Sequence, residues 1–452
     1  MKTLLTVLLM IFTAVGYSQT INNMTLVGSK NEYTSGGTPS GWHYSSCWGY
    51  TDLNGREYAM IGFYGGTAFY DITDAPTITN VGMIPGPGSF YNYRNIKTYS
   101  HYAYMVSEGG DGLQIVDLQY LPDSVHFIKS YYYTGFTKAH TLSQNGHYLY
   151  LNGGNNNPAG GVTILDITDP ENPVKRGTWS TRYVHDCYVR NDTIYAACIN
   201  AGYLSILNAT NPDNITLISE FTYPQPVTHN AWLSADGNYL AISNEGGSNH
   251  TFLWDVTNKT NAIQLSEIIP YENSMVHNAI IKGDSLYMAH YRGGIIVCDI
   301  SNKSTPVEVG HYDTYPGSGT AYQGAWMVYP FFSSGKIIGS DIATGLYVLK
   351  MGTSTNITNN NGMNPDEYSL SQNYPNPFNP MTRIDFNIPK SGLVTVKVYD
   401  NTGREVATLL NEDRSSGAYS VYFDGASFSS GVYFYSIKTD GFTDTKKMLL
   451  VK

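Results

Sequence analysis

The sequence is poor in charge. Only 14% of its 452 residues are Asp, Glu, Lys or Arg, whereas 13% are aromatic, a balance opposite to that of disordered chains. The net charge is -10, and residues 367–452 carry equal numbers of acidic and basic side chains, so the acidity belongs to the preceding part of the chain. An acidic surface is unsuited to a nucleic-acid backbone, and we expect no nucleic-acid partner. The length predicts two or more domains or a repeat array.

Cysteine is also scarce. The chain contains Cys47, Cys187, Cys198 and Cys298. Their spacing fits neither a zinc knuckle, nor a CxxC redox pair, nor a disulfide-rich scaffold. We expect small, buried strand residues, and the sequence leaves open whether any two form a disulfide.

Long apolar runs are absent except near the N-terminus. Lys2 precedes the apolar run Leu4–Val15, which is too short to span a bilayer of about 30 Å, and small residues follow at Gly16 and Ser18. We predict a secretory signal peptide over residues 1–18 and no transmembrane helix in the mature protein.

Internal repeats organise the chain after this segment. Segments such as GGVTILDITDPENP and GGIIVCDISNKSTP share a turn, a short apolar strand and a polar closing residue. The closing residues, spaced by 42 to 51 positions, are Asp71, Asp117, Asp166, Asn208, Asp255, Asp299 and Lys350. This period is typical of propeller blades. The DITDP strings resemble acidic calcium loops, but we interpret the Asp residues as Asx-turn formers that set the path into the next strand.

Each repeat also contains a predicted hairpin, as in HTLSQNGHYLYL, and a fourth strand such as Val174–Trp179. Four short strands in each of seven units predict an all-β fold, a seven-bladed β-propeller over residues 19–351. The apolar stretch Met24–Val27 is suited to close the ring by joining the last blade, beside the strand that ends near Lys350.

Several segments carry a resemblance to a known family. HYAYMVSEGGDGLQIVDL, VTHNAWLSADGNYLAISNEG and MVHNAIIKGDSLYMAHYRGGIIVCDIS resemble the LVIVD-repeat propellers called choice-of-anchor B proteins. The resemblance extends over residues 20–351 and implies a propeller. The family is named for its repeats and its varied anchors, so the resemblance implies neither an activity nor catalytic residues.

The C-terminal part is a separate module. Residues 352–366 are polar and Asn-rich and read as a linker. In residues 367–452, alternating segments separated by turns predict a small antiparallel, immunoglobulin-like β-sandwich.

This module contains the motifs YPNPFNP, VKVYDNTGREV and SGVYFYSIKTDGFTDTKKMLLVK. They resemble the type A sorting domain of the type IX secretion system of Bacteroidetes. The motif residues are Tyr374, Pro375, Asn376, Pro377, Gly403, Gly431, Lys447 and Lys452. The resemblance implies export across the outer membrane by the type IX machinery and removal of the tail by a sortase-like peptidase. The body would then be released or attached to surface lipopolysaccharide.

Candidate functional residues lie where the blades begin. If the first strand of each blade lines the central channel, its opening residue lies at one rim. Aligned on the turns, these residues are Ser45, Arg94, His140, His185, His229, His277 and Gln323. The adjoining loops add Glu108, Glu245, His290 and Arg292, and nearby aromatic residues suited to stacking on sugars or peptides are Trp42, Tyr64, Tyr91, Tyr93 and Tyr322.

The rim histidines allow two interpretations. Imidazoles and carboxylates that converge on a concave mouth are the ligands that zinc, manganese or iron prefer, so His140, His185, His229 and His277 are candidate ligands of a divalent metal ion. A repeat can equally carry His to cap a turn, and a wide channel can hold the rings too far apart for one ion.

Two functions fit this sequence. The first is a secreted or surface-attached propeller that binds a glycan, a peptide or a surface protein through its rim. The second is a metal-dependent hydrolase or lyase that uses the four histidines as ligands and Glu245 as a base. The sequence contains no HExxH, GxSxG, GxxxxGK[ST], GxGxxG or EF-hand string, which favours binding.

Overall fold

The structure is a computed structural model. It describes residues 21–86, 91, 93–156, 159–246, 250–269, 274–315, 322–352, 367–414, 416–425 and 428–452. The predicted signal peptide and residues 353–366 of the predicted linker lie outside this set. All regular elements in the described residues are strands, as the all-β prediction requires. In the same residues, no helix has the length and hydropathy that crossing a membrane demands.

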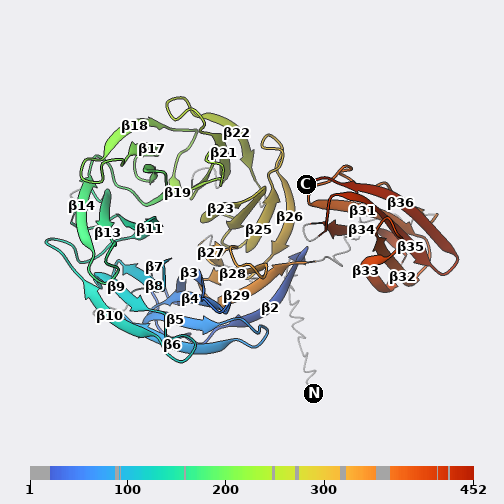
Figure 1. The fold of residues 1–452 in the computed structure, drawn as a ribbon, viewed down its shortest axis with the longest axis horizontal. Coiled ribbons are helices and arrows are strands. Elements are labelled where there is room, and N and C mark those ends of the chain that lie inside the picture. The colour runs from blue at the N-terminus through green and yellow to red at the C-terminus, as the bar shows by residue number, and fades with distance from the viewer. Residues whose placement is uncertain are drawn as a thin grey trace, which may run out of the picture.

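Most of the described chain forms antiparallel sheets arranged as a ring (Figure 1). Blade 1 joins β3 (Tyr44–Thr51), β4 (Glu57–Phe63), β5 (Gly66–Asp71) and β6 (Thr79–Pro85). Blade 2 joins β7 (Arg94–Tyr99), β8 (Tyr102–Ser107), β9 (Leu113–Asp117) and β10 (His126–Tyr131). Blade 3 joins β11 (Thr141–Asn145), β12 (Tyr148–Asn152), β13 (Val162–Asp166) and β14 (Val174–Trp179).

The remaining sheets of the ring repeat this order. Blade 4 joins β15 (Asp186–Arg190), β16 (Thr193–Cys198), β17 (Tyr203–Asn208) and β18 (Thr216–Phe221). Blade 5 joins β19 (Thr228–Leu233), β20 (Tyr239–Asn244), β21 (Thr251–Asp255) and β22 (Ile263–Ile268). Blade 6 joins β23 (Asn278–Lys282), β24 (Ser285–Ala289), β25 (Ile295–Asp299) and β26 (Val307–Tyr312), with β1 (Ile21–Asn22) at its edge.

The N-terminal segment closes the ring. Blade 7 contains β27 (Ala325–Tyr329), β28 (Lys336–Asp341) and β29 (Gly345–Met351), and its fourth strand is β2 (Met24–Lys30). Met24 pairs with Met351, and Lys30 pairs with Leu346. The closure expected for Met24–Val27 is therefore observed, with a strand three residues longer. Pairing the two ends of the ring in one sheet covers an edge that would otherwise be open.

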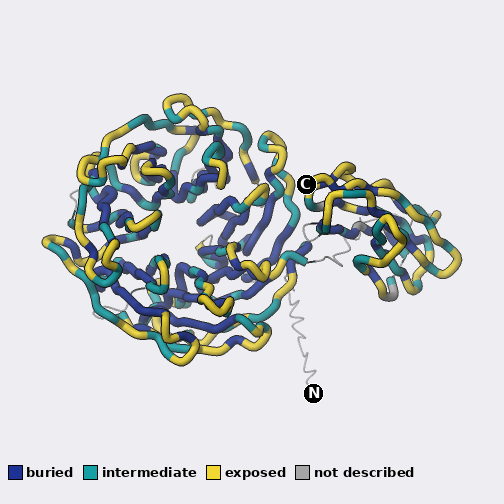
Figure 2. Tube along the Cα trace, in the orientation of Figure 1, coloured by how far each residue is buried: buried dark blue, intermediate teal, exposed yellow. Residues whose placement is uncertain are grey.

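The first strands of the blades surround the channel. Each of β3, β7, β11, β15, β19, β23 and β27 contacts the first strand of the next blade, and β27 returns to β3. The middle strands of the blades are mostly buried (Figure 2). Apolar side chains from neighbouring blades pack between the sheets, as Ile164 of β13 and Ile194 of β16 do. All four cysteines are buried here as free thiols.

The Asx turns at the ends of the third strands are confirmed. The backbone N–H of Thr73 donates to Asp71 Oδ1 over 2.9 Å. Asp117, Asp166, Asn208, Asp255 and Asp299 accept the same bond from the residue two positions on. The repeated side chains therefore satisfy their own turns.

The C-terminal module is a sandwich of two antiparallel sheets. One contains β30 (Ser369–Leu370), β31 (Met381–Ile388) and β34 (Gly417–Asp424). The other contains β32 (Gly392–Tyr399), β33 (Glu405–Arg414), β35 (Gly431–Thr439) and β36 (Phe442–Leu450). Side chains from both sheets, such as Ile384 and Val396, share one buried core. The alternating burial along β32 is the pattern expected of a strand with one face in the core.

Candidate functional site

Four histidines form an arc at one end of the channel. His140, His185 and His277 directly precede β11, β15 and β23, and His229 is the second residue of β19. Consecutive ring centroids lie 4.1, 4.2 and 4.2 Å apart. The indole of Trp326 continues the arc, with its centroid 4.0 Å from that of His277. Equivalent positions of neighbouring blades are therefore close enough for the rings to touch.

The next blade fixes the tautomer of two of these rings. His185 Nδ1 lies 3.1 Å from the backbone oxygen of His229, and His277 Nδ1 lies 2.6 Å from that of Trp326. A carbonyl oxygen only accepts, so Nδ1 carries the hydrogen in His185. His277 Nδ1 also lies 3.0 Å from the Nδ2 amide of Asn278, but that amide has other acceptors in Trp326 and Met327, so we assign the hydrogen to Nδ1 in His277 as well. In the neutral imidazole, Nε2 then keeps its lone pair.

His140 makes the corresponding bond to a carboxylate. Its Nδ1 lies 2.6 Å from Glu108 Oε1, and the hydroxyl of Tyr91 donates to Glu108 Oε2 over 3.0 Å. Burial disfavours the charged form of Glu108, but these hydrogen bonds outweigh it and hold the pKa of Glu108 below its ordinary value. Glu108 is therefore an ionised acceptor that orients the His140 ring.

Burial keeps three rings of the arc uncharged, those of His185, His229 and His277. Desolvation, reinforced by the neighbouring imidazoles, lowers the pKa of His185 and of His277 well below the ordinary value of 6.5. Desolvation also lowers the pKa of His229, although the carboxylate of Glu245 opposes the shift. At neutral pH these three rings present lone pairs and not additional N–H donors.

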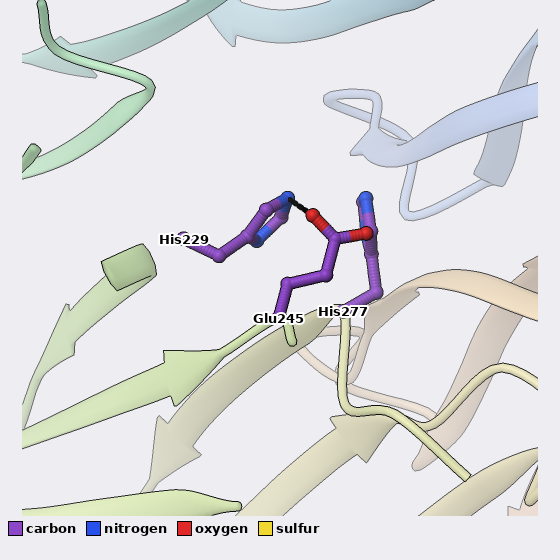
Figure 3. A group of neighbouring side chains, drawn as sticks. All are labelled: His229, Glu245 and His277. Carbon is purple, nitrogen blue, oxygen red and sulfur yellow. Dashed lines mark ion pairs between the residues drawn. The ribbon is translucent and has the colours of Figure 1, made fainter. Parts of the chain in front are cut away.

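Glu245 lies between two of the rings (Figure 3). It directly follows β20, and its Oε2 atom is 3.4 Å from His229 Nε2. That separation suits an ion pair, but His229 Nε2 makes no hydrogen bond within the described residues. The hydroxyl of Tyr291 donates to the other oxygen, Oε1. One ligand atom each from His229, Glu245 and His277 lies within 4.8 Å of the other two, a group that could hold a metal ion.

A cavity of ≈ 380 Å³ opens in front of this arc. It is lined by Trp42, Tyr93, His140, His185, His229, Glu245, His277, Tyr291, Tyr322 and Trp326. The same four histidines also line a second cavity of ≈ 40 Å³, together with Arg94, Lys97 and Asp186. The imidazoles therefore separate a wide mouth from a narrow inner space.

The structure gathers part of the predicted rim. His140, His185, His229, His277 and Glu245 line the mouth, and so do three of the aromatic residues expected there, Trp42, Tyr93 and Tyr322. Two further predicted residues take supporting places. Glu108 orients His140, and the buried guanidinium of Arg94 pairs with Asp111 over 2.7 Å and lines only the inner cavity.

Besides Arg94 and Glu108, the predicted residues that do not line the mouth are Ser45, Tyr64, Tyr91, His290, Arg292 and Gln323. His290 is fully buried, and burial lowers its pKa to about 3. Its neighbour Tyr291 reaches the cavity in place of His290 and Arg292. Tyr291 has a φ of 29°, in the left-handed region. This backbone turn interrupts the alternation of side chains along a strand, from which the sequence predicts the positions of His290 and Arg292.

In blade 7, Trp326 and not Gln323 lies at the channel mouth. The pairing of β27 with β28 shifts between Ala325 and Met327, just as the pairing of β19 with β20 shifts between Thr228 and Asn230. The residue left out of register is Trp326 in one blade and His229 in the other. The equivalent residues of the two blades are therefore His229 and Trp326, and alignment on the turns points three residues too early in blade 7. Within QGAWMVYP, the tryptophan itself is the available signal.

The fold and its site define a class of protein, a repeat protein of radially arranged four-stranded sheets with a polar and aromatic cavity at its channel mouth. Two family models match the chain. Residues 275–314 match the LVIVD repeat, and residues 372–452 match the secretion system C-terminal sorting domain. The chain therefore contains an LVIVD repeat and ends in a sorting domain. This domain indicates type IX secretion to the cell surface or the extracellular space and implies interaction with the secretion machinery.

Other comparisons are less informative. No curated protein matches the chain. Among solved structures, it is similar to a functionally unknown protein from Desulfotomaculum acetoxidans, with 12% sequence identity and a TM-score of 0.46. The similarity covers 61% of this chain and 87% of that one. At this level it carries no argument about function.

Proposed function

We propose that the chain is an exported binding protein whose propeller, over residues 19–351, holds a ligand in the channel-mouth cavity. The observation that carries this proposal is a cavity of ≈ 380 Å³ walled by aromatic rings and floored by imidazoles. Ligand sites are typically concave, mostly apolar and furnished with a few convergent polar groups. A cavity of this size suits a small molecule or one unit of a chain, and not the flat face of a folded partner.

The chemistry of the walls favours a saccharide unit. The rings of Trp42, Tyr93 and Tyr322 line the cavity, and aromatic rings are suited to pack against the C–H faces of a sugar. The neutral imidazoles of His185, His229 and His277 and the carboxylate of Glu245 accept hydrogen bonds, and the hydroxyl of Tyr291 already donates to Glu245. The cavity also offers donors, the hydroxyls of Tyr93 and Tyr322 and the indole N–H of Trp42. With the acceptors and the negative charge of Glu245, it suits an uncharged ligand rich in hydroxyl groups better than an anion.

Saccharide binding to the full mature chain tests this proposal. A panel of neutral mono- and disaccharides is titrated by calorimetry, with tryptophan fluorescence as a second readout. We expect Trp42→Ala to weaken binding at least tenfold, because stacking on its indole is lost. Phe331→Ala, an exposed aromatic beyond the opposite end of β27, is the matched control and retains affinity. Equal affinity in the wild type and Trp42→Ala would place the ligand elsewhere.

The fate of the tail is part of the proposal. We infer that a sortase-like peptidase removes the sorting domain, proposed to comprise residues 367–452, and that the propeller is then released or attached to lipopolysaccharide. The match to the sorting domain supports this step. The intact mass of the protein recovered outside cells with a functional type IX system tests it. A secreted product that retains Lys452 contradicts it.

A metal-dependent hydrolase or lyase is the second candidate, favoured by the group of His229, Glu245 and His277. His140 and His185 are not members of this group. Glu245 lies among the donors and cannot serve at once as ligand and base, which favours binding over turnover. Release of product from chromogenic glycosides or esters by the wild type, lost in His277→Ala, would reverse that preference.

A further inference from the structure

The three polar residues at the cavity floor come from two neighbouring blades. His229 belongs to β19 and Glu245 follows β20, both in blade 5, whereas His277 precedes β23 of blade 6. Figure 3 shows the carboxylate between the two imidazoles. The 3.4 Å between His229 Nε2 and Glu245 Oε2 equals the edge of a tetrahedron with bonds of roughly 2.1 Å, the length of zinc–nitrogen bonds. The third donor lies within 4.8 Å of both, so a small rotation of a side chain completes the set.

Two of these donors, His277 and Glu245, are oriented by hydrogen bonds as metal ligands are oriented. His277 donates its Nδ1 hydrogen to the backbone of Trp326, which leaves Nε2 for another partner. Tyr291 donates to one oxygen of Glu245 and leaves the other facing His229. Metal-bound imidazoles and carboxylates are usually held by hydrogen bonds of this kind.

His229 supplies an independent observation. Its side chain is 3% exposed, and within the described residues its Nε2 makes no hydrogen bond although it faces Glu245. A buried polar atom without a partner costs free energy, and a bound cation would satisfy it. The exposed pair His250–Glu267 has no third donor in a group of this kind within the described residues.

We propose that His229, Glu245 and His277 bind a divalent transition-metal ion whose open coordination position faces the channel-mouth cavity. Two imidazoles and one carboxylate suit zinc, iron or manganese better than calcium, which prefers oxygen ligands alone. Three protein ligands leave a fourth position for water or for an oxygen of the ligand. The inference rests on the proposed function, because the ion would there coordinate a hydroxyl group of the bound saccharide.

Metal binding to the full mature chain, purified without a histidine tag, tests the proposal. After treatment with chelator and its removal, Zn²⁺ is titrated by calorimetry, and Co²⁺ is added as a spectroscopic probe. We expect one ion per chain and visible absorption typical of a site with fewer than six ligands. Glu245→Gln and His229→Ala lower the affinity at least 100-fold. Tyr291→Phe, which removes only the orienting bond, lowers it about tenfold.

Glu267→Gln is the matched control, since it removes a carboxylate from a histidine pair outside the channel and leaves the affinity unchanged. Circular dichroism and melting temperature verify that each variant is folded. Failure of the folded wild type to bind Zn²⁺ or Co²⁺, or unchanged affinity in folded Glu245→Gln, overturns the proposal.

Saccharide binding by the metal-free protein separates the two proposals. If saccharides bind equally well with and without Zn²⁺, coordination of a saccharide hydroxyl by the ion fails while the proposed function stands. If Co²⁺ binds as expected and no saccharide alters its spectrum or binds by calorimetry, the proposed ligand class fails while the metal site stands. A spectrum that changes on addition of saccharide supports both.

Discussion

Two ends of the repeated blade place polar residues very differently. At the end of the third strand, each repeated Asp or Asn accepts a hydrogen bond from its own turn, as Asp255 does from Thr257 over 2.9 Å. At the channel mouth, His185 and His277 each donate the Nδ1 hydrogen to a backbone oxygen of the next blade, which leaves Nε2 available to the cavity. The Asp and Asn side chains find their hydrogen-bond partners within one repeat. The histidines find theirs only in the next blade, and Nε2 of each ring is still available to bind a ligand.

Repetition alone therefore does not identify a functional residue. The Asp residues recur in more blades than the histidines, yet their hydrogen bonds are consumed locally. The histidines occupy consecutive blades 3 to 6, and the opening positions of blades 2 and 7 hold Arg94 and Trp326. A functional site is indicated instead by residues whose polar atoms remain available after the ring has formed, as the Nε2 atoms of His185 and His277 do.

Removing one partner of the buried ion pair in blade 2 has the largest expected effect on stability. Arg94 and Asp111 form a 2.7 Å pair whose side chains are almost fully buried. Arg94→Met leaves Asp111 as an uncompensated buried charge, and we expect a loss of about 3–5 kcal/mol in the free energy of unfolding. Urea unfolding measures it. The double variant Arg94→Met/Asp111→Leu recovers most of the loss, and a single variant within 1 kcal/mol of wild type contradicts the account.

The Asp residues at the ends of the third strands differ in how far they are buried. Asp71 is buried, accepts from Thr73 and pairs with Arg56, whereas Asp255 serves only its own turn among the hydrogen bonds of the described residues. We expect Asp71→Ala to cost about 2 kcal/mol, because both a charge-assisted bond and a turn bond are lost.

The pH dependence of Asp71 provides a second measurement. Burial opposes ionisation of Asp71, but bonds from Thr73 and Arg56 outweigh it and lower its pKa below 3.8. Stability from this group is then present above its ordinary pKa and is lost as the pH falls through the lowered value. The difference between wild type and Asp71→Ala shrinks in acid. A difference that grows on acidification contradicts the assignment.

Much of this comparison follows from the sequence, and the exceptions have physical causes. The repeat spacing predicts the strands, the ring closure by Met24–Val27 and the four histidines on one side. It does not predict Trp326 or Tyr291. The first depends on a bulge after Ala325, and the second on a left-handed backbone at one residue. Both are local departures from strand geometry, which a periodic pattern cannot encode.

The inner cavity contains a polar group that lowers stability. Lys97 is buried beneath the histidines, where desolvation lowers its pKa to about 8 and the charge of Asp186 opposes the shift. Because the pKa is lowered on folding, the unfolded chain binds the proton more tightly, and stability rises with pH between about 8 and the ordinary value of 10.5.

Lys97→Met is therefore expected to stabilise the protein. At pH 7 the gain is about 1–2 kcal/mol, because part of the relief from desolvation is offset by loss of the contact between Lys97 and the Trp48 ring. The gain disappears as the pH approaches 10. Thermal unfolding at pH 7 and pH 10 measures it, with Lys175→Met, at an exposed lysine of β14, as control. An advantage that grows with pH has the wrong sign for this mechanism.

The smallest expected effect on stability is that of exchanging Asp for Asn at the end of a third strand. Blade 4 carries Asn208 where blade 5 carries Asp255, and each accepts the same 2.9 Å bond through Oδ1. Asp255→Asn should therefore change stability by less than about 0.5 kcal/mol, whereas Asp255→Ala loses the turn bond and costs about 1 kcal/mol. Urea unfolding at pH 7 distinguishes the two. If Asp255→Asn lowers the free energy of unfolding as much as Asp255→Ala, the charge of Asp255 contributes to stability. The Asp residues at the ends of the third strands would then do more than form turns.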